Sequence, residues 1–314
     1  MIPHDKNILV IGELNIDLLL NNISGFPAIG RETLAADMHI ILGSSSAIFA
    51  ANIAVLGTAT AFCGMVGNDY FGRFILDELQ RKNIDTKNII IDTSKTGLTV
   101  VMNYGEDRAN VTYAGAMERF AFSDIPEDLA AFGHLHLSSY FLQKTLKPDI
   151  TLLFKNAKAK GLTTSLDLQW DPDNKWDFPY SECLPYVDVF LPNEAEILSL
   201  TNSESVEKAI EKIAPFAEII VVKRGTKGAL AFNRGTTFIS PAMLHNYFVD
   251  AIGAGDSFNA GFIYKYLKGD SLDNCLRFGN LCGAVNTTAT GGTGAFRDLP
   301  LFTEKAKLLF NTEV

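Results

Sequence analysis

Short apolar runs separated by helical patterns constrain the fold of this chain more than any other feature. Parallel strands buried on both faces are apolar at every position, because successive side chains point to opposite faces. Such runs lie at 8–11, 61–63, 134–137, 164–166, 187–191 and 219–222. Helical patterns lie at about 45–56, 71–82, 149–160, 194–200, 205–214, 256–267, 272–288 and 303–310. This alternation predicts an α/β fold built from βαβ units around a mostly parallel sheet.

Two regions interrupt the alternation and predict a second, smaller sheet. Residues 98–104 and 110–114 have strand patterns on either side of the turn 105–108, and 33–42 also has an extended pattern. Strands joined by a short turn pair in an antiparallel manner. We therefore expect a small antiparallel sheet, inserted into the α/β body as a flap.

Charge and cysteine usage limit the classes of partner. The 314 residues carry a net charge of −9, so there is no basic surplus for nucleic acid phosphates or anionic lipid. The uncharged stretch 40–68 is punctuated by glycines and serines, which favours a turn, a buried helix and a strand over a membrane span. The four cysteines are far apart in the sequence and form no CxxC pair: Cys63, Cys183, Cys275 and Cys282. Cysteines spaced in this way are typical of cytoplasmic proteins, in which thiols stay reduced. We expect a cytoplasmic protein without a nucleic acid or membrane partner.

The two common nucleotide-binding motifs are missing, but another glycine-rich turn is present. The chain has no GxxxxGK(S/T) run, and Gly12–Asn15 follows the first strand in place of a GxGxxG turn. Further along, Gly253, Ala254 and Gly255 lead directly into a helical pattern. Small residues at a helix N-terminus leave free N–H groups that can bind an anion.

Asp256 follows this turn and has two interpretations. Beside a bound phosphate, its carboxylate can accept the proton of an attacking hydroxyl, as phosphoryl transfer to an alcohol requires. An aspartate in the first turn of a helix is also favourable for the helix dipole alone. Spacing does not separate a general base from a helix-terminus residue.

Asn193 and Glu196 form a second pair of candidates, directly after the strand pattern 187–191. Asn at an N-cap with Glu three residues later is a capping box, which is the simpler interpretation. At the carboxyl end of a strand, the same pair can also hold waters of a Mg²⁺ ion bound to nucleotide phosphates.

Polar residues also follow other predicted strands. Asn15 and Asp17 lie two residues apart on one side of an extended segment, where they can bind a polyol or simply face solvent. Asp167, after the run 164–166, has the same two interpretations. His134 and His136 share one strand face and are expected to be core histidines without a chemical role.

In this order, the segments resemble the PfkB family of carbohydrate kinases over nearly the whole chain. Residues 250–262 are similar to the family's C-terminal signature, with its GAGD anion hole and catalytic aspartate, although Ala251 departs from it. Asn193–Glu196 matches the NxxE motif, Asp17 the substrate aspartate, and 67–72 the GxDxxG turn.

The resemblance implies a ribokinase-like, three-layer α/β/α fold with a central, mostly parallel sheet and a small β-sheet lid. It implies one domain over 1–314, with the lid formed by insertions near 13–42 and 95–119. It also implies binding of ATP and Mg²⁺, a monovalent cation such as K⁺, and a homodimer made through the lid sheets.

Residue patterns predict part of the site, whereas the resemblance alone implies Lys223, Gly225, Gly228 and Asn286 on the nucleotide side and the ligands of the monovalent cation. Asp256 is the expected catalytic base, and the expected anion hole consists of Gly253, Ala254 and Gly255. The residues expected to bind the acceptor are Asn15, Asp17, Gly43, Ser44, Ile48 and Asp167. The residues expected on the nucleotide side are Asn193, Lys223, Gly225, Gly228 and Asn286. The expected metal contacts are Asn193 and Glu196 for Mg²⁺ through water, and Asp250 and Ile252 for the monovalent cation.

One departure from the family concerns the acceptor. The N-terminal signature has two glycines, three further residues and an Asn that helps to bind the sugar, but here Ser44 replaces the second glycine and Ile48 the Asn. An aliphatic group in place of a hydrogen-bonding one predicts a less polar pocket wall, suited to a deoxygenated or reoriented sugar or to a nucleoside.

The predicted function is ATP-dependent phosphorylation of a primary hydroxyl of a small, ribose- or fructose-like sugar. Three alternatives remain: a nucleoside kinase of the same family, a non-catalytic sugar-binding protein on the same fold, and an NAD-dependent dehydrogenase. The last lacks the glycine fingerprint of its class.

Overall fold

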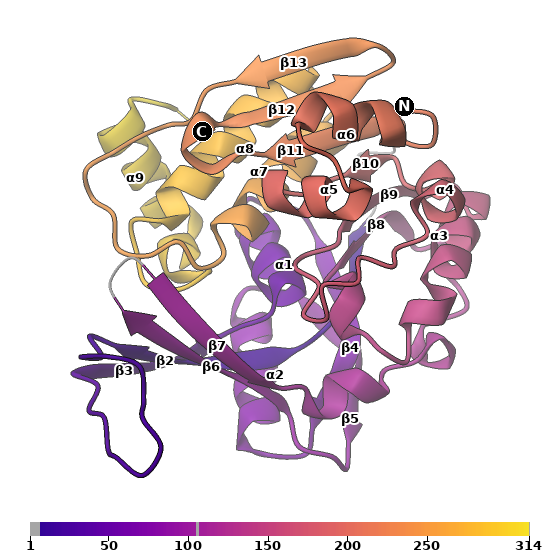
Figure 1. Cartoon of the computed structure of the whole chain (residues 1–314). Coiled ribbons are helices and arrows are strands. Elements are labelled where there is room, and N and C mark those ends of the chain that lie inside the picture. Colours follow the sequence, from indigo (N-terminus) through magenta and orange to yellow (C-terminus); the bar gives the residue numbers. More distant parts are fainter. Residues whose placement is uncertain (1–6, 105–106, 314) are drawn as a thin grey trace.

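The computed structural model describes residues 7–104 and 107–313, which build a main sheet and a smaller one (Figure 1). The main sheet has nine strands in the described residues, in the order β13-β12-β11-β10-β9-β8-β1-β4-β5. Their bounds are β1 Asn7–Ile11, β4 Thr60–Gly67, β5 Asp85–Asp92, β8 Phe132–Ser138, β9 Thr163–Asp167, β10 Val189–Phe190, β11 Ile219–Lys223, β12 Ala229–Asn233 and β13 Thr236–Ser240. All neighbours pair in parallel except β11-β12 and β12-β13.

Helices cover both faces of this sheet, which explains the uninterrupted apolar runs. In β1, Ile8 and Val10 belong to one buried cluster, whereas Leu9 and Ile11 belong to the other. The helices that contribute to the first cluster are α1 Ser45–Val55, α2 Tyr70–Arg81, α7 Ala254–Leu267 and α8 Leu272–Asn286. Those of the second are α3 Ile150–Ala159, α4 Tyr180–Cys183, α5 Glu194–Thr201 and α6 Val206–Ile213. α9, Leu299–Phe310, packs with α8 in a further cluster. The predicted α/β fold is thus confirmed.

The smaller sheet forms the lid and has the order β3-β2-β6-β7. Its strands are β2 Asn15–Asn21, β3 Asp37–Leu42, β6 Gly97–Tyr104 and β7 Asp107–Tyr113. The prediction of a wholly antiparallel sheet is wrong, because β2 and β6 pair in parallel. Both strands leave the main sheet at its carboxyl edge, β2 after β1 and β6 after β5, and therefore run in the same direction.

The turn predicted at 105–108 is only partly a turn. Residues 107 and 108 belong to β7, where they pair with 104 and 103 of β6. Gly105 and Glu106 lie outside the described residues.

Three strands of the main sheet escaped the sequence patterns. β5 is an edge strand, and most of its residues are partly exposed. β12 and β13 form an antiparallel hairpin at the other edge, and β13 is mostly exposed. The edge strands β5 and β13 need no continuous apolar run, because their side chains are partly exposed, whereas β12 is not an edge strand and has the apolar run 229–232.

Two further observations concern the lengths of the helices and the state of the cysteines. None of the helices in the described part of the chain is long and apolar enough to cross a membrane. Cys63, Cys183, Cys275 and Cys282 are all free and buried.

Candidate active site

A cavity of about 260 Å³ lies between the lid and the carboxyl edge of the main sheet. It opens where parallel α/β sheets bind their ligands, beyond the ends of β1 and β9. The polar side chains that line it from the lid are Asn15, Asp17, Thr99, Arg108, Asn110 and Thr112. Those that line it from the body are Glu13, Ser44, Ser45, Ser139, Gln169 and Asp256.

The lid wall of the cavity is a hydrogen-bonded polar row. Asn15 Nδ2 donates to Asp17 Oδ1 at 3.1 Å and to Thr99 Oγ1 at 2.9 Å. Burial raises the pKa of Asp17 to about 7, and the Asn15 hydrogen bond opposes this rise. Gly43 leaves room for this row, because a side chain at that position would collide with Asp17.

The glycine-rich turn lies on the opposite side of the cavity, at the start of α7. Gly253 is the N-cap residue with φ 73°, a left-handed conformation that favours glycine. The cap has no side-chain hydrogen bond among the described residues. The Ala254 amide donates to the carbonyl of Ala251 at 3.3 Å, a long hydrogen bond, and Gly255 follows in the first turn, where N–H groups have no carbonyl partner one turn earlier in the helix. This geometry suits an anion.

Two side chains hold the glycine-rich turn in place through hydrogen bonds to its backbone or to neighbouring backbone. Asp250 accepts backbone hydrogen bonds from Ile252 N and Gly291 N, both at 2.9 Å. Asn286 is fully buried and donates to the carbonyl of Ile252 at 2.7 Å. Asn286 therefore supports the turn and has no exposed surface for a nucleotide.

Asp256 lines the cavity from the first turn of α7 and is only 7% exposed. Its Oδ1 accepts a hydrogen bond from Gln169 Nε2 at 3.0 Å. Burial, with a smaller contribution from the negative charge of Asp167, raises the pKa of Asp256 to about 8, and Lys223 opposes this rise. The carboxyl group thus titrates near neutral pH, the range in which a general base operates.

Asp167 lies below the cavity and is not one of its lining residues. It is fully buried, and its Oδ2 lies 2.5 Å from both Lys223 Nζ and Asn259 Nδ2. The expected contact with an acceptor is therefore replaced by a buried ion pair. Lys223 is held in this pair and also donates to Asn259 Oδ1 at 3.2 Å.

Asn193 and Glu196 form a capping box at the start of α5, as the simpler of their two interpretations predicts. The Glu196 amide donates to Asn193 Oδ1 at 2.9 Å, and the Asn193 amide donates to Glu196 Oε2 at 2.8 Å. Asn193 Nδ2 also donates to Glu196 Oε1 at 2.6 Å. Burial, followed by the charge of Asp167, raises the pKa of Glu196 to about 7. The carboxyl group of Glu196 is thus buried more deeply than helix capping at a protein surface requires.

Ser44 and Ile48 show what the departure from the family signature does. Ser44 has φ 70°, the conformation that a glycine adopts more easily, and its hydroxyl caps α1 by accepting from Ala47 N. Ile48 lines the cavity but is only 3% exposed, since its side chain packs against Gly253 and Gly292. The less polar wall that the sequence predicts is present, and it also supports the glycine-rich turn.

Gly225 and Gly228 form a tight turn after β11. Both have positive φ, 56° and 87°, and Gly228 N donates to Gly225 O at 3.0 Å. A side chain on Gly228 would meet the backbone of residues 240–242, whereas Gly225 is open.

Sequence reasoning missed several residues of the cavity. Glu13 comes two residues after β1, and Gln169 comes two residues after β9, so their place at the carboxyl ends of strands was an available signal. Arg108 lies in a lid strand and had no such signal. The expected core histidines are confirmed: His134 and His136 bond to hydroxyl groups at 2.7–2.8 Å, and burial holds the pKa of both below its usual value.

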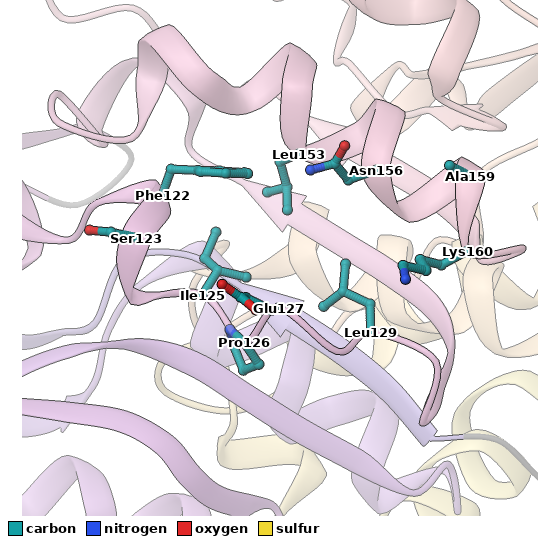
Figure 2. A pocket seen from close by; sticks show the side chains of 10 residues that line it. All are labelled: Phe122, Ser123, Ile125, Pro126, Glu127, Leu129, Leu153, Asn156, Ala159 and Lys160. Carbon is teal, nitrogen blue, oxygen red and sulfur yellow. The ribbon is translucent and has the colours of Figure 1, made fainter.

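A second cavity, of about 480 Å³, lies between α3 and the segment 122–129 (Figure 2). Apolar side chains line it, among them Phe122, Ile125 and Leu153, together with the charged side chains of Lys160 and Glu127. None of the predicted site residues lines it. The described residues also contain no group of three or more His, Cys, Asp or Glu side chains that could hold a metal ion.

Known proteins resemble this chain in sequence and in fold. The chain is 27% identical to the 5-dehydro-2-deoxygluconokinase of Geobacillus thermodenitrificans over 309 residues, which cover 91% of this chain and 89% of that protein. The adenosine kinase of Sinorhizobium meliloti superposes with a TM-score of 0.82 at 21% identity, over 91% of this chain and 95% of that one. A putative ribokinase II from E. coli, solved in complex with ATP and Mg²⁺, superposes with a TM-score of 0.80 at 23% identity, over 91% and 94% of the two chains.

These structures share the ribokinase-like fold with this chain. The model of the pfkB family of carbohydrate kinases matches residues 5–298, which is nearly the whole sequence. The chain therefore belongs to the pfkB family of carbohydrate kinases and is a sugar kinase, a phosphotransferase that acts on a sugar hydroxyl.

Proposed function

We propose that the chain transfers the γ-phosphoryl group of ATP to a primary hydroxyl of a small sugar bound between Asp17 and Asp256. One observation carries this proposal: the Asp256 carboxyl lines the cavity at the N-terminus of α7, beside an uncapped glycine-rich turn. An acceptor hydroxyl and a transferred phosphoryl group can meet there.

The chemical step needs one base and one anion hole. Asp256 takes the proton of the acceptor hydroxyl as its oxygen forms a bond to the γ-phosphorus and the bond from that phosphorus to ADP breaks. The amides of Gly253, Ala254 and Gly255 stabilise the negative charge on the transferred group, together with the positive end of the α7 dipole.

The lid side of the cavity orients the acceptor. Asp17 accepts hydrogen bonds from sugar hydroxyls, and Asn15 donates hydrogen bonds to them. Gly43 and Ser44 shape the wall beside these two residues. The lid strands cover the cavity, which limits the access of water that would otherwise hydrolyse ATP.

The residues on the nucleotide side fit magnesium held through water. Both carboxylate oxygens of Glu196 already accept hydrogen bonds from Asn193, so direct ligation would break the capping box. Mg²⁺ keeps most of its hydration shell at nucleotide phosphates and, when bound, neutralises their charge. The presence of ATP and Mg²⁺ in the E. coli relative supports this assignment.

Two further expectations, a monovalent cation site and a homodimer, have physical support. Asp250 and the carbonyl of Ile252 offer oxygen ligands for a monovalent cation beside the turn. The outer face of the lid exposes Met38, Val111 and Tyr113 by 54%, 60% and 55%, an apolar surface that a second copy of the chain would cover. A sedimentation mass of one chain would refute the homodimer, and equal activity in Na⁺ and K⁺ would refute the cation site.

An ADP-release assay over a panel of acceptors tests the function. The panel includes pentoses, hexoses, ketoses, deoxy sugars and nucleosides. We expect turnover with a sugar, whereas turnover with adenosine or inosine alone would establish the nucleoside kinase alternative. Sugar binding without ADP release would establish a non-catalytic protein.

A second candidate acceptor is a sugar acid, and Arg108 favours it. Arg108 is the one cationic side chain among the described lining residues of the cavity, and no ion pair involves it in the described part of the chain. Its charge interacts with Asp17, whose pKa it lowers against the larger effect of burial. A guanidinium is suited to a carboxylate, which it binds with two parallel hydrogen bonds. The relative from Geobacillus is by name a kinase of a deoxygluconate.

The variant Arg108→Gln separates the two acceptor classes. For a sugar acid, we expect the acceptor KM to rise by about tenfold or more, since a charge-assisted hydrogen bond contributes roughly 1.5–3 kcal/mol. For a neutral sugar, KM should stay within about twofold. A variant with unchanged KM for every acidic acceptor would refute the sugar-acid assignment.

A further inference from the structure

Gln169 joins the two buried carboxyl groups beneath the cavity. Its Nε2 lies 3.0 Å from Oδ1 of Asp256 and 3.2 Å from Oδ2 of Asp167. A primary amide nitrogen carries two hydrogens, so one Gln side chain can donate to both carboxylates at once. The three residues come from two different elements, since Asp256 is in α7 whereas Asp167 and Gln169 are at the end of β9.

The backbone of Gln169 is held in an unfavourable conformation. Its φ is 59°, in the left-handed region that non-glycine residues rarely adopt. The Gln169 amide N–H also lies 3.3 Å from Oδ1 of Asp167, which fixes the turn after β9. Backbone strain of this kind persists where the surrounding structure holds a residue in place for a specific contact.

We propose that Gln169 is a positioning residue for the general base: its side-chain amide holds Oδ1 of Asp256 and ties this carboxylate to Asp167. Ser45 makes a further side-chain hydrogen bond to Asp256, and the remaining lone pairs of the carboxylate can accept the proton of the acceptor hydroxyl. Asp167 is itself fixed by Lys223 and Asn259, so the contact orients Asp256 against a rigid, buried support. This inference rests on the proposed role of Asp256 as the base.

The charged groups around Asp256 predict how the contact acts on its titration. Asp167 and Glu13 disfavour the carboxylate form of Asp256, whereas Lys223 favours it. The amide of Gln169 donates to the carboxylate and therefore favours the ionised, basic form. Without this donor, Asp256 should lose its proton only at a higher pH.

The test compares the pH dependence of kcat in the full-length wild type and in Gln169→Met, which keeps the side-chain length but removes the donor. We expect the acid limb of the profile to move up by about one pH unit, the typical effect of one hydrogen bond to a charged group. On the high-pH plateau, kcat should fall by about tenfold because the carboxylate is no longer oriented.

Gln143→Met is the matched control. Gln143 is a buried glutamine whose Nε2 donates to the carbonyl of Ser138, and it does not line the cavity. This variant should keep the wild-type pH midpoint. A variant Gln169→Glu keeps a polar end group and places a further carboxyl beside Asp256, so its midpoint should move up at least as far as that of Gln169→Met.

Two outcomes overturn the inference. If Gln169→Met keeps the wild-type midpoint and a kcat within about twofold, Gln169 does not position the base. If Gln169→Met does not fold, an unchanged midpoint in Gln169→Glu refutes the inference equally. The activity of Asp256→Asn distinguishes failure of this inference from failure of the proposed function. If Asp256→Asn is nearly inactive and Gln169→Met is normal, only the role of Gln169 is refuted. If Asp256→Asn is active, the proposed function itself is refuted.

Discussion

Replacing Asp256 with Asn is the most informative perturbation of this chain. Asn keeps the size of the side chain and can still hydrogen-bond to Gln169, but it cannot take a proton at neutral pH. A general base contributes roughly a hundredfold to ten-thousandfold, so kcat should fall by this factor, which is about 3–5 kcal/mol of barrier. The affinity for ATP should change little near neutral pH, where Asp256 is largely protonated, and should rise slightly above pH 8, where the substitution removes a negative charge beside the γ-phosphate.

The same substitution should stabilise the fold, and the sign follows from the pKa of Asp256. The pKa is about 8 in the folded chain against an ordinary value of 3.8, so between these values the folded state keeps a proton that the unfolded state has released. This contribution to stability is present at low pH and is lost as the pH rises through that window. Asn removes the cost, so the variant should gain on the order of a few kcal/mol at pH 8 and much less at pH 5.

Three measurements check this prediction: kcat, the dissociation constant of ATP, and thermal unfolding at pH 5 and pH 8. Asp188→Asn is a suitable control, because Asp188 is also buried but pairs with Lys158 away from the cavity. We expect the control to keep its kcat and to lose stability. A near-native kcat in Asp256→Asn would refute the general base and leave Asp256 as a helix-terminus residue.

The remaining predictions concern the metal side and the acceptor wall. Glu196→Gln should raise the Mg²⁺ concentration needed for half-maximal rate while the chain stays folded; a loss of about 1 kcal/mol of unfolding free energy with unaltered Mg²⁺ dependence would instead support a pure capping role. Ile48→Asn should improve turnover of ribose or fructose relative to the preferred acceptor, and should cost roughly 1–3 kcal/mol of stability because a buried apolar contact with Gly253 and Gly292 is lost. An unchanged ranking of acceptors in that variant would show that Ile48 acts only through packing.

Features formed by neighbouring residues could be predicted from the sequence. The turn at Gly253 and the start of α7 depend on backbone freedom and on unpaired N–H groups, which a few consecutive residues determine. The capping box of Asn193 and Glu196 is local for the same reason, although its burial is not. The continuous apolar runs predicted the central strands because burial on both faces leaves no polar position.

The tertiary structure alone decided which distant residues meet. Gln169 and Asp256 are 87 positions apart, and Asp167 and Lys223 are 56 apart, so no spacing in the sequence relates them. Their contacts follow from the strand order, which places the ends of β9 and β11 on either side of β10 and near α7. For the same reason, the sequence could not show that Asp167 is buried in an ion pair below the cavity. A carboxylate after a strand looks identical in sequence whether it faces a ligand or a lysine, and only the packing of the elements around it makes the difference.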